Sequence, residues 1–166
     1  MNELLEQIET ACDTGHLYLA LFCSLTLPDI CGAISSPDGL ATGPRYKEWF
    51  DKFIAPKYDG LFDGSNCYAF RCSTLHQGKA EHRNLGYDRV LFLAPLPGGE
   101  CVMHKNILND ALNLDLVLFC KDLVNGVRDW VATESHQPDF QKNINTVLRR
   151  YPGGLSPYII GVDVYA

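Results

Sequence analysis

Hydrophobic residues near the start of the chain follow the spacing of one helical face. They are Leu4, Leu5, Ile8, Ala11 and Cys12, with glutamates on the opposite face. The next stretch, residues 17–27, is apolar on nearly every side, which is typical of a helix buried all round. We predict that Pro28 kinks or restarts this helix and that residues 35–39 form a loop.

Two more helices are predicted before residue 80. One begins at Pro44, because proline suits the first turn of a helix. It carries an aromatic face that we interpret as core: Tyr46, Trp49, Phe50, Phe53 and Ile54. The other spans residues 65–77, where apolar positions keep helical spacing and Gly78 is a natural stop.

The pattern changes in the second half of the chain. Residues 90–93 and 101–103 are short apolar runs around a turn-rich segment, which predicts a β-hairpin. A clean helical stripe then covers residues 112–130, and a last helix covers residues 137–150. Residues 158–164 are predicted to form a terminal strand that joins the hairpin in a small sheet. We therefore expect a mainly α, single-domain helical bundle over residues 1–166, with a small β-hairpin insertion and a C-terminal strand.

Composition narrows the function classes. The 166 residues carry a net charge of −6, which argues against non-specific binding to duplex nucleic acid, since such binding needs a basic face. The seven cysteines are odd in number and mostly lie in apolar helical patterns, so we interpret them as reduced. The N-terminal residues lack the pattern of a signal peptide, and residues 17–27 are shorter than a membrane span. These features favour a cytoplasmic protein that does not enter a membrane.

The candidate chemistry lies in residues 71–78, Arg-Cys-Ser-Thr-Leu-His-Gln-Gly, on the predicted fourth helix. This segment resembles the HEPN superfamily, whose helical bundles often carry an Arg, four to six residues, then His and frequently Gly. Many members are metal-independent endoribonucleases of toxin and antiviral defence systems, and they commonly form homodimers. The resemblance implies that Arg71 and His76 are paired catalytic residues. It also implies RNA or a nucleotide as ligand, a homodimer, and a protein partner such as an antitoxin.

The residue types suit that chemistry. Cleavage of RNA by its own 2′-hydroxyl needs a group that moves protons, for which His76 is suited, and a group that stabilises charge on the phosphate. Arg71 meets the second need, because its fork of donors matches two phosphate oxygens. Residues five apart diverge by about 140° around a helix, so Arg71 and His76 do not share a face. A two-fold dimer or the long reach of arginine would close the site.

One position departs from the family pattern, in which a polar residue often follows the Arg directly. Here it is Cys72, four residues before His76 and therefore at the place from which a side chain would orient the histidine. Positive charge gathers after it, and Lys79 and Arg83 join Arg71 as candidate phosphate-binding residues. Two alternatives stay open. The chain could be a non-catalytic HEPN-like dimerisation or partner-binding module, or His76 could cap a helix while Arg71 pairs with an acidic neighbour.

Other site chemistries are less well supported. Zinc could use Cys67, Cys72 and His76, or Cys101 with His104, but the spacing lacks a C-x2-C knuckle, so we expect no metal and no cofactor. A catalytic Cys72 would need activation by His76, and a buried structural thiol is the favoured interpretation. No glycine-rich phosphate loop follows a strand, which disfavours nucleotide-dependent phosphoryl transfer.

Overall fold

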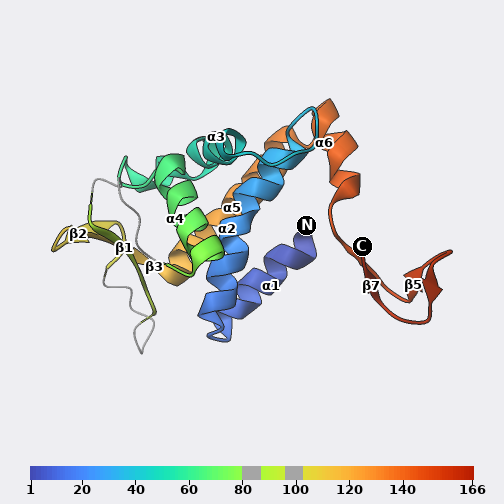
Figure 1. The fold of residues 1–166 in the computed structure, drawn as a ribbon, viewed down its shortest axis with the longest axis horizontal. Helices are drawn as coiled ribbons and strands as arrows, with labels where there is room; N and C mark the ends of the chain where they lie inside the picture. Colours follow the sequence, from blue (N-terminus) through green and yellow to red (C-terminus); the bar gives the residue numbers. More distant parts are fainter. Residues whose placement is uncertain (80–86, 96–102) are drawn as a thin grey trace.

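The computed structural model describes residues 1–79, 87–95 and 103–166. Within these ranges the fold is mainly α, as predicted (Figure 1). Its helices are α1 (Asn2–Asp13), α2 (Leu17–Ile34), α3 (Gly43–Phe53), α4 (Gly64–Gln77), α5 (Leu116–Glu134) and α6 (Pro138–Asn143). Short 3-10 turns follow α3 and α6, as η1 (Ala55–Tyr58) and η2 (Ile144–Thr146).

Helix α2 is the centre of the bundle. It packs against α1, α3 and α5 and also contacts α4 and α6. The helix continues through Pro28, so of the two predicted effects the restart is wrong. Proline removes one backbone hydrogen bond, but packing on several sides holds the helix together across that point. By length and mean hydropathy (1.7) α2 could also cross a membrane, and half of that window is buried inside this fold.

Helix α3 and helix α4 form a close pair on one side of α2. The predicted aromatic face of α3 is confirmed as core, since Tyr46, Trp49 and Phe50 are buried. The first residue of α4, Gly64, lies so near α3 that a Cβ there would stand 2.5 Å from the Lys47 carbonyl oxygen. The helices can approach this closely because glycine has no side chain.

Both ends of α4 are fixed by local chemistry. The Asp63 side chain accepts a hydrogen bond from the Asn66 backbone N–H at 2.8 Å and completes a capping box. At the other end Gly78 adopts the left-handed conformation (φ 65°), which confirms the predicted stop. The segment that carries Arg71 and His76 is therefore a well-defined helix.

A three-stranded sheet lies at one end of the bundle, in the order β1-β3-β2. Strand β1 (Arg89–Leu93) agrees with the prediction, but it pairs in parallel with β3 (Ala111–Asp115), which also pairs antiparallel with β2 (Asn106–Leu108). The prediction that residues 101–103 pair with β1 in a hairpin is therefore wrong for the part of that segment that the structure describes. Met103 lies outside any strand, and residues 101–102 fall outside the described residues.

Strand β3 runs directly into α5, so the helix predicted from residue 112 begins four residues later. All five residues of β3 are buried, and β1 and β2 hydrogen-bond to its two edges. The Asp115 side chain accepts from the Leu118 backbone N–H at 2.8 Å and caps α5. Pairing with the other strands, together with this cap, ends the strand and starts the helix.

The last part of the chain differs most from expectation. The helix predicted over residues 137–150 ends at residue 143, and Arg150 already lies in a strand. Residues 148–166, here called the C-terminal arm, contain two small antiparallel pairs and do not join the sheet as predicted. The pairs are β4 (Arg150–Tyr151) with β7 (Val164–Tyr165), and β5 (Gly154–Leu155) with β6 (Ile159–Ile160).

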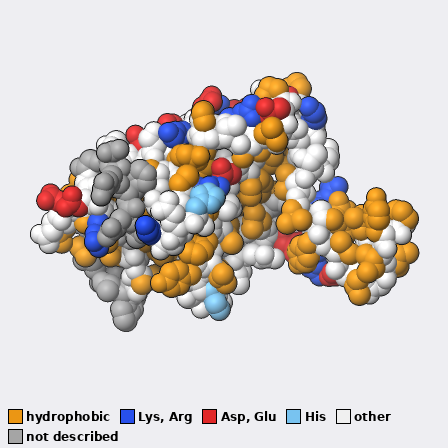
Figure 2. All heavy atoms as spheres, viewed as in Figure 1, with side chains coloured by type: hydrophobic (Ala, Val, Ile, Leu, Met, Phe, Trp, Pro, Cys, Tyr) orange, Lys and Arg blue, Asp and Glu red, His pale blue; other side chains and the backbone are white. Residues whose placement is uncertain are grey.

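The C-terminal arm extends away from the helices and exposes apolar side chains. Hydrophobic atoms cover much of it at the right of Figure 2. Tyr158 is 84% exposed and Ile160 78% exposed. Near its base an ion pair joins Arg150 to Glu3 of α1 at 3.7 Å. Two-residue strands without a core of their own are marginally stable in water.

Candidate functional site

The structure brings Arg71 and His76 together within one chain. Arg71 Nη1 lies 2.7 Å from His76 Nε2, although the two residues diverge around α4. A two-fold dimer or the long reach of arginine was expected to bring the two residues together, and the reach of the arginine side chain is the one observed. On its other side Arg71 contacts Asp29 of α2, with Nε at 2.9 Å and Nη2 at 2.7 Å from the same carboxylate oxygen. The three side chains form a continuous row, Asp29–Arg71–His76.

The contact between Arg71 and His76 has a defined direction. A guanidinium has only donors, so Arg71 donates and His76 Nε2 accepts. The acceptor nitrogen carries no proton, which places the imidazole proton on Nδ1 in this arrangement. An oxyanion that took the Nη1 donor from His76 would leave Nε2 free to accept a proton.

Burial separates the roles of the three side chains. The side chains of Asp29 and Arg71 are only 16% and 19% exposed, whereas His76 is exposed. Burial raises the pKa of Asp29, and the nearby charge of Arg71 offsets this only in part. For Arg71 burial lowers the pKa, yet the charge and hydrogen bond of Asp29, together with a smaller contribution from Cys72, outweigh it and the pKa is raised. The cation is thus held in place, while the histidine faces solvent.

Asp29 was not singled out from the sequence. It lies 42 residues before Arg71, and spacing gives no hint that the two meet. A signal was nevertheless present, because Asp29 is the only charged residue in the whole of α2. A lone charge in an apolar helix calls for a partner, since an unpaired buried charge is costly. One part of the alternative hypothesis is therefore confirmed, namely that Arg71 pairs with an acidic neighbour.

The other predicted site residues are less closely involved. Within the described residues His76 hydrogen-bonds to Arg71, and no hydrogen bond joins it to Cys72. The Cys72 thiol instead interacts with Tyr68 and raises the pKa of that phenol. Lys79 is exposed just after α4, where its backbone N–H donates to the Ser73 carbonyl at 3.0 Å. Arg83 falls outside the described residues.

The residues considered for zinc have other roles. Cys67 is fully buried, where its sulfur lies 3.2 Å from the Tyr46 hydroxyl, and burial raises its pKa to about 12. His104 accepts a hydrogen bond from the Asp115 backbone N–H at 3.1 Å. Within the described ranges, no three potential metal ligands come together. Cys101 lies outside them.

Comparisons with protein-family models, with curated proteins and with solved structures find no match.

Proposed function

We propose that the chain is a HEPN-like, metal-independent endoribonuclease that uses Arg71 to hold a phosphate and His76 to move a proton. The observation that carries the proposal is the 2.7 Å contact between the two side chains, with the histidine exposed. Asp29 is the positioning residue, because it holds the guanidinium from behind and leaves its outer donors directed toward His76.

The expected reaction follows from these positions. A phosphate oxygen takes the Nη1 donor of Arg71 away from His76, which frees Nε2. The nitrogen then accepts the proton of the RNA 2′-hydroxyl, whose oxygen attacks phosphorus while the bond to the 5′ oxygen breaks. The departing 5′ oxygen takes a proton from water, and the hydroxide left behind takes back the proton that His76 accepted. The products are a 2′,3′-cyclic phosphate and a 5′-hydroxyl end, and Arg71 stabilises the charge that develops on the phosphate.

Two exposed aromatic residues lie on the same face of α2 as Asp29. Phe22 and Tyr18 stand seven and eleven residues before it, so at 100° per residue all three lie within about 40° of one another. Phe22 is about 10 Å from Asp29 along the helix axis. The two rings pack edge to face at 6.1 Å, and Tyr18 is 79% exposed. Exposed rings of this kind stack on bases of single-stranded RNA, which supports RNA as substrate.

The test is cleavage of mixed single-stranded RNA by the purified protein in EDTA. We expect the wild type and His136→Ala, which changes another exposed histidine, to cleave the RNA and leave 2′,3′-cyclic phosphate ends. His76→Ala should abolish cleavage, and Arg71→Lys should reduce it at least tenfold, because lysine lacks the fork. Tyr18→Ser should raise KM with a smaller effect on kcat. Failure of the wild type to cleave, or cleavage unchanged in His76→Ala, would refute the proposal.

A second candidate is a non-catalytic module that dimerises through the C-terminal arm. The observation that favours it is the exposed apolar surface around Tyr158 and Ile160, which the fold leaves without a core. Sedimentation equilibrium tests it. Tyr158→Ser and Ile160→Ser should weaken self-association, while Leu40→Ser, at an exposed leucine elsewhere, should not. A wild-type protein that stays monomeric at high concentration would contradict this candidate.

A further inference from the structure

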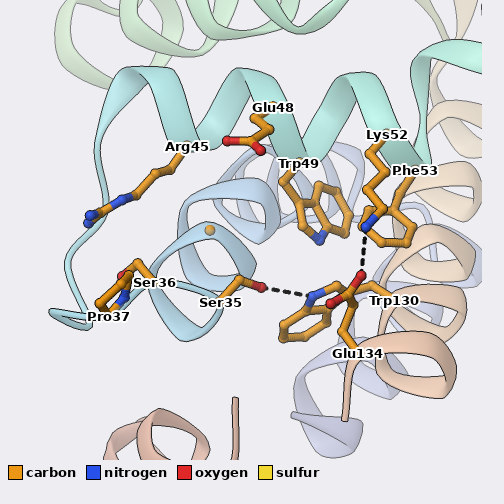
Figure 3. Close-up of a pocket in the computed structure, with 11 residues that line it drawn as sticks. Ser35, Ser36, Pro37, Arg45, Glu48, Trp49, Lys52, Phe53, Trp130 and Glu134 are labelled. Atoms are coloured by element: carbon orange, nitrogen blue, oxygen red, sulfur yellow. Dashed lines mark hydrogen bonds and ion pairs between the residues drawn. The ribbon is translucent and has the colours of Figure 1, made fainter. Parts of the chain in front are cut away.

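A pocket of about 330 Å³ lies between α3, the end of α2 and the end of α5 (Figure 3). It includes none of the residues of the Asp29–Arg71–His76 row. Aromatic rings form much of its wall, from Trp49 and Phe53 on α3 and Trp130 on α5. Its volume lies at the small end of the range for ligand sites in proteins.

The pocket contains a buried donor without an acceptor. Trp49 is only 4% exposed, and within the described residues its indole N–H has no hydrogen-bond partner. The nearby Trp130 N–H donates to the Ser35 hydroxyl at 3.0 Å. The two indoles meet edge to face, with centroids 6.5 Å apart, and the nitrogen of Trp49 faces the space beside Ser35 and Trp130 (Figure 3). Buried donors are nearly always paired, so this N–H lacks an acceptor that an oxygen atom of a ligand bound beside it would supply.

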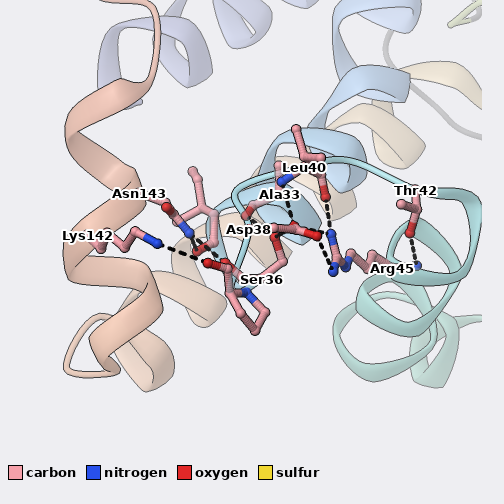
Figure 4. Close-up of polar contacts among 10 residues, drawn as sticks. Ala33, Ser36, Asp38, Leu40, Thr42, Arg45, Lys142 and Asn143 are labelled. Carbon is pink, nitrogen blue, oxygen red and sulfur yellow. Dashed lines mark hydrogen bonds and ion pairs between the residues drawn. The ribbon is translucent and has the colours of Figure 1, made fainter.

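Both cations around the pocket are paired with carboxylates, and one further carboxylate is left unpaired. Arg45 is held by Asp38 through two hydrogen bonds, 2.5 and 3.1 Å long, and it also donates to the Leu40 carbonyl (Figure 4). Lys52 pairs with Glu134 at 2.6 Å. The Glu48 side chain makes no hydrogen bond or ion pair to any described residue, and its carboxylate lies beside the pocket on α3. The uncompensated group is therefore a carboxylate.

We infer that this pocket binds a small primary amine that also carries a carbonyl or hydroxyl oxygen. The ammonium pairs with Glu48, the oxygen accepts the hydrogen bond of the Trp49 indole, and the apolar part lies against Trp130 and Phe53. An anion is a poorer ligand, because both cations at the pocket already have carboxylate partners. This site is independent of the proposed ribonuclease activity.

The two tryptophans of the chain make the test specific, because both line this pocket and the sequence has no other. In a 1H–15N spectrum the two indole N–H signals report on the pocket alone, and Trp130→Phe assigns them. Leucinamide is the probe, since it has an ammonium group, a carbonyl and an apolar side chain. N-acetyl-leucinamide lacks the ammonium, and 3-methylbutylamine lacks the carbonyl, so they serve as matched controls.

We expect leucinamide to shift the Trp49 indole signal saturably and each control compound to bind at least fivefold more weakly. Glu48→Gln should weaken leucinamide binding roughly tenfold, because it removes a charge-assisted hydrogen bond. Glu6→Gln, at an exposed glutamate of α1, should bind as the wild type does. An indole signal that does not move, equal binding of all three compounds, or unchanged binding by Glu48→Gln would overturn the inference and leave the pocket to water. Glu48 is exposed, so its variant should fold and decide the matter.

Discussion

Replacement of Asp29 by asparagine tests the ion pair that joins α2 to α4. Asparagine keeps the size of the side chain and one acceptor oxygen, but it removes the charge that Arg71 faces with both Nε and Nη2. The guanidinium would then stay four-fifths buried with no carboxylate beside it. The fold should tolerate the change in shape and lose stability through electrostatics alone.

The expected magnitude lies between two known limits. Exposed ion pairs contribute about 0–1 kcal/mol, whereas removal of one partner from a fully buried pair costs about 3–5 kcal/mol. Asp29 and Arg71 are mostly buried but still reach solvent, and the raised pKa of Asp29 shows that burial costs this carboxylate more than the charge of Arg71 returns, so the loss comes from leaving the Arg71 guanidinium unpaired. We therefore expect Asp29→Asn to lower the free energy of unfolding by about 2–3 kcal/mol.

Urea unfolding followed by tryptophan fluorescence measures this loss, and a double-mutant cycle attributes it. Arg71→Gln and the double variant Asp29→Asn/Arg71→Gln complete the cycle. Because each single change leaves the other partner unpaired, the double variant should be more stable than additivity predicts, by about 1–2 kcal/mol. A loss below about 0.5 kcal/mol in Asp29→Asn, or additive effects in the cycle, would show that the pair does not hold α4 against α2.

Two further changes probe other parts of the fold. Gly64→Ala should lower the free energy of unfolding by about 2–3 kcal/mol, because its Cβ would meet the Lys47 backbone at 2.5–2.9 Å. As a control, Ser65→Ala at the exposed next position should change the free energy of unfolding by no more than about 0.5 kcal/mol. An equal effect of the two changes in urea unfolding would contradict the close approach of the helices. Burial and Lys105 lower the pKa of His104, so the unfolded chain takes up its proton at a higher pH than the folded one. Stability should therefore fall as the pH falls below about 6.5. Urea unfolding at a series of pH values measures this dependence, and His104→Asn should flatten it. An unchanged slope in the variant would refute the assignment of this pH dependence to His104.

The sequence predicted the helices where local signals agree with packing. Helix α4 is an example, because the spacing of its apolar residues and the stop at Gly78 both come from neighbouring positions. Strand β3 is the opposite case. Leu112 fits the helical stripe of α5 as well as a strand, and its pairing with Val90 of the distant β1 and Ile107 of β2 decides between them. Local periodicity contains no information about that partner.

In the candidate site, too, the features set by neighbouring residues were predicted and those set by distant packing were missed. Arg71 and His76 were identified because they lie five residues apart on one helix. Asp29 was missed because its position beside Arg71 depends on how α2 packs against α4. The pocket around Trp49 was also missed, since the sequence favours a core interpretation for an aromatic face and cannot show that one indole donor lacks an acceptor.

The central position of α2 has a consequence for synthesis on the ribosome. Helix α2 is complete at residue 34, but α5, one of its main packing partners, ends at residue 134. At about 5–20 residues per second, this delay is roughly 5–20 s, during which a strongly apolar helix has only part of its final cover. The nascent chain should therefore be a client of chaperones that bind apolar segments, and faster translation between residues 34 and 134 should increase the yield of folded protein.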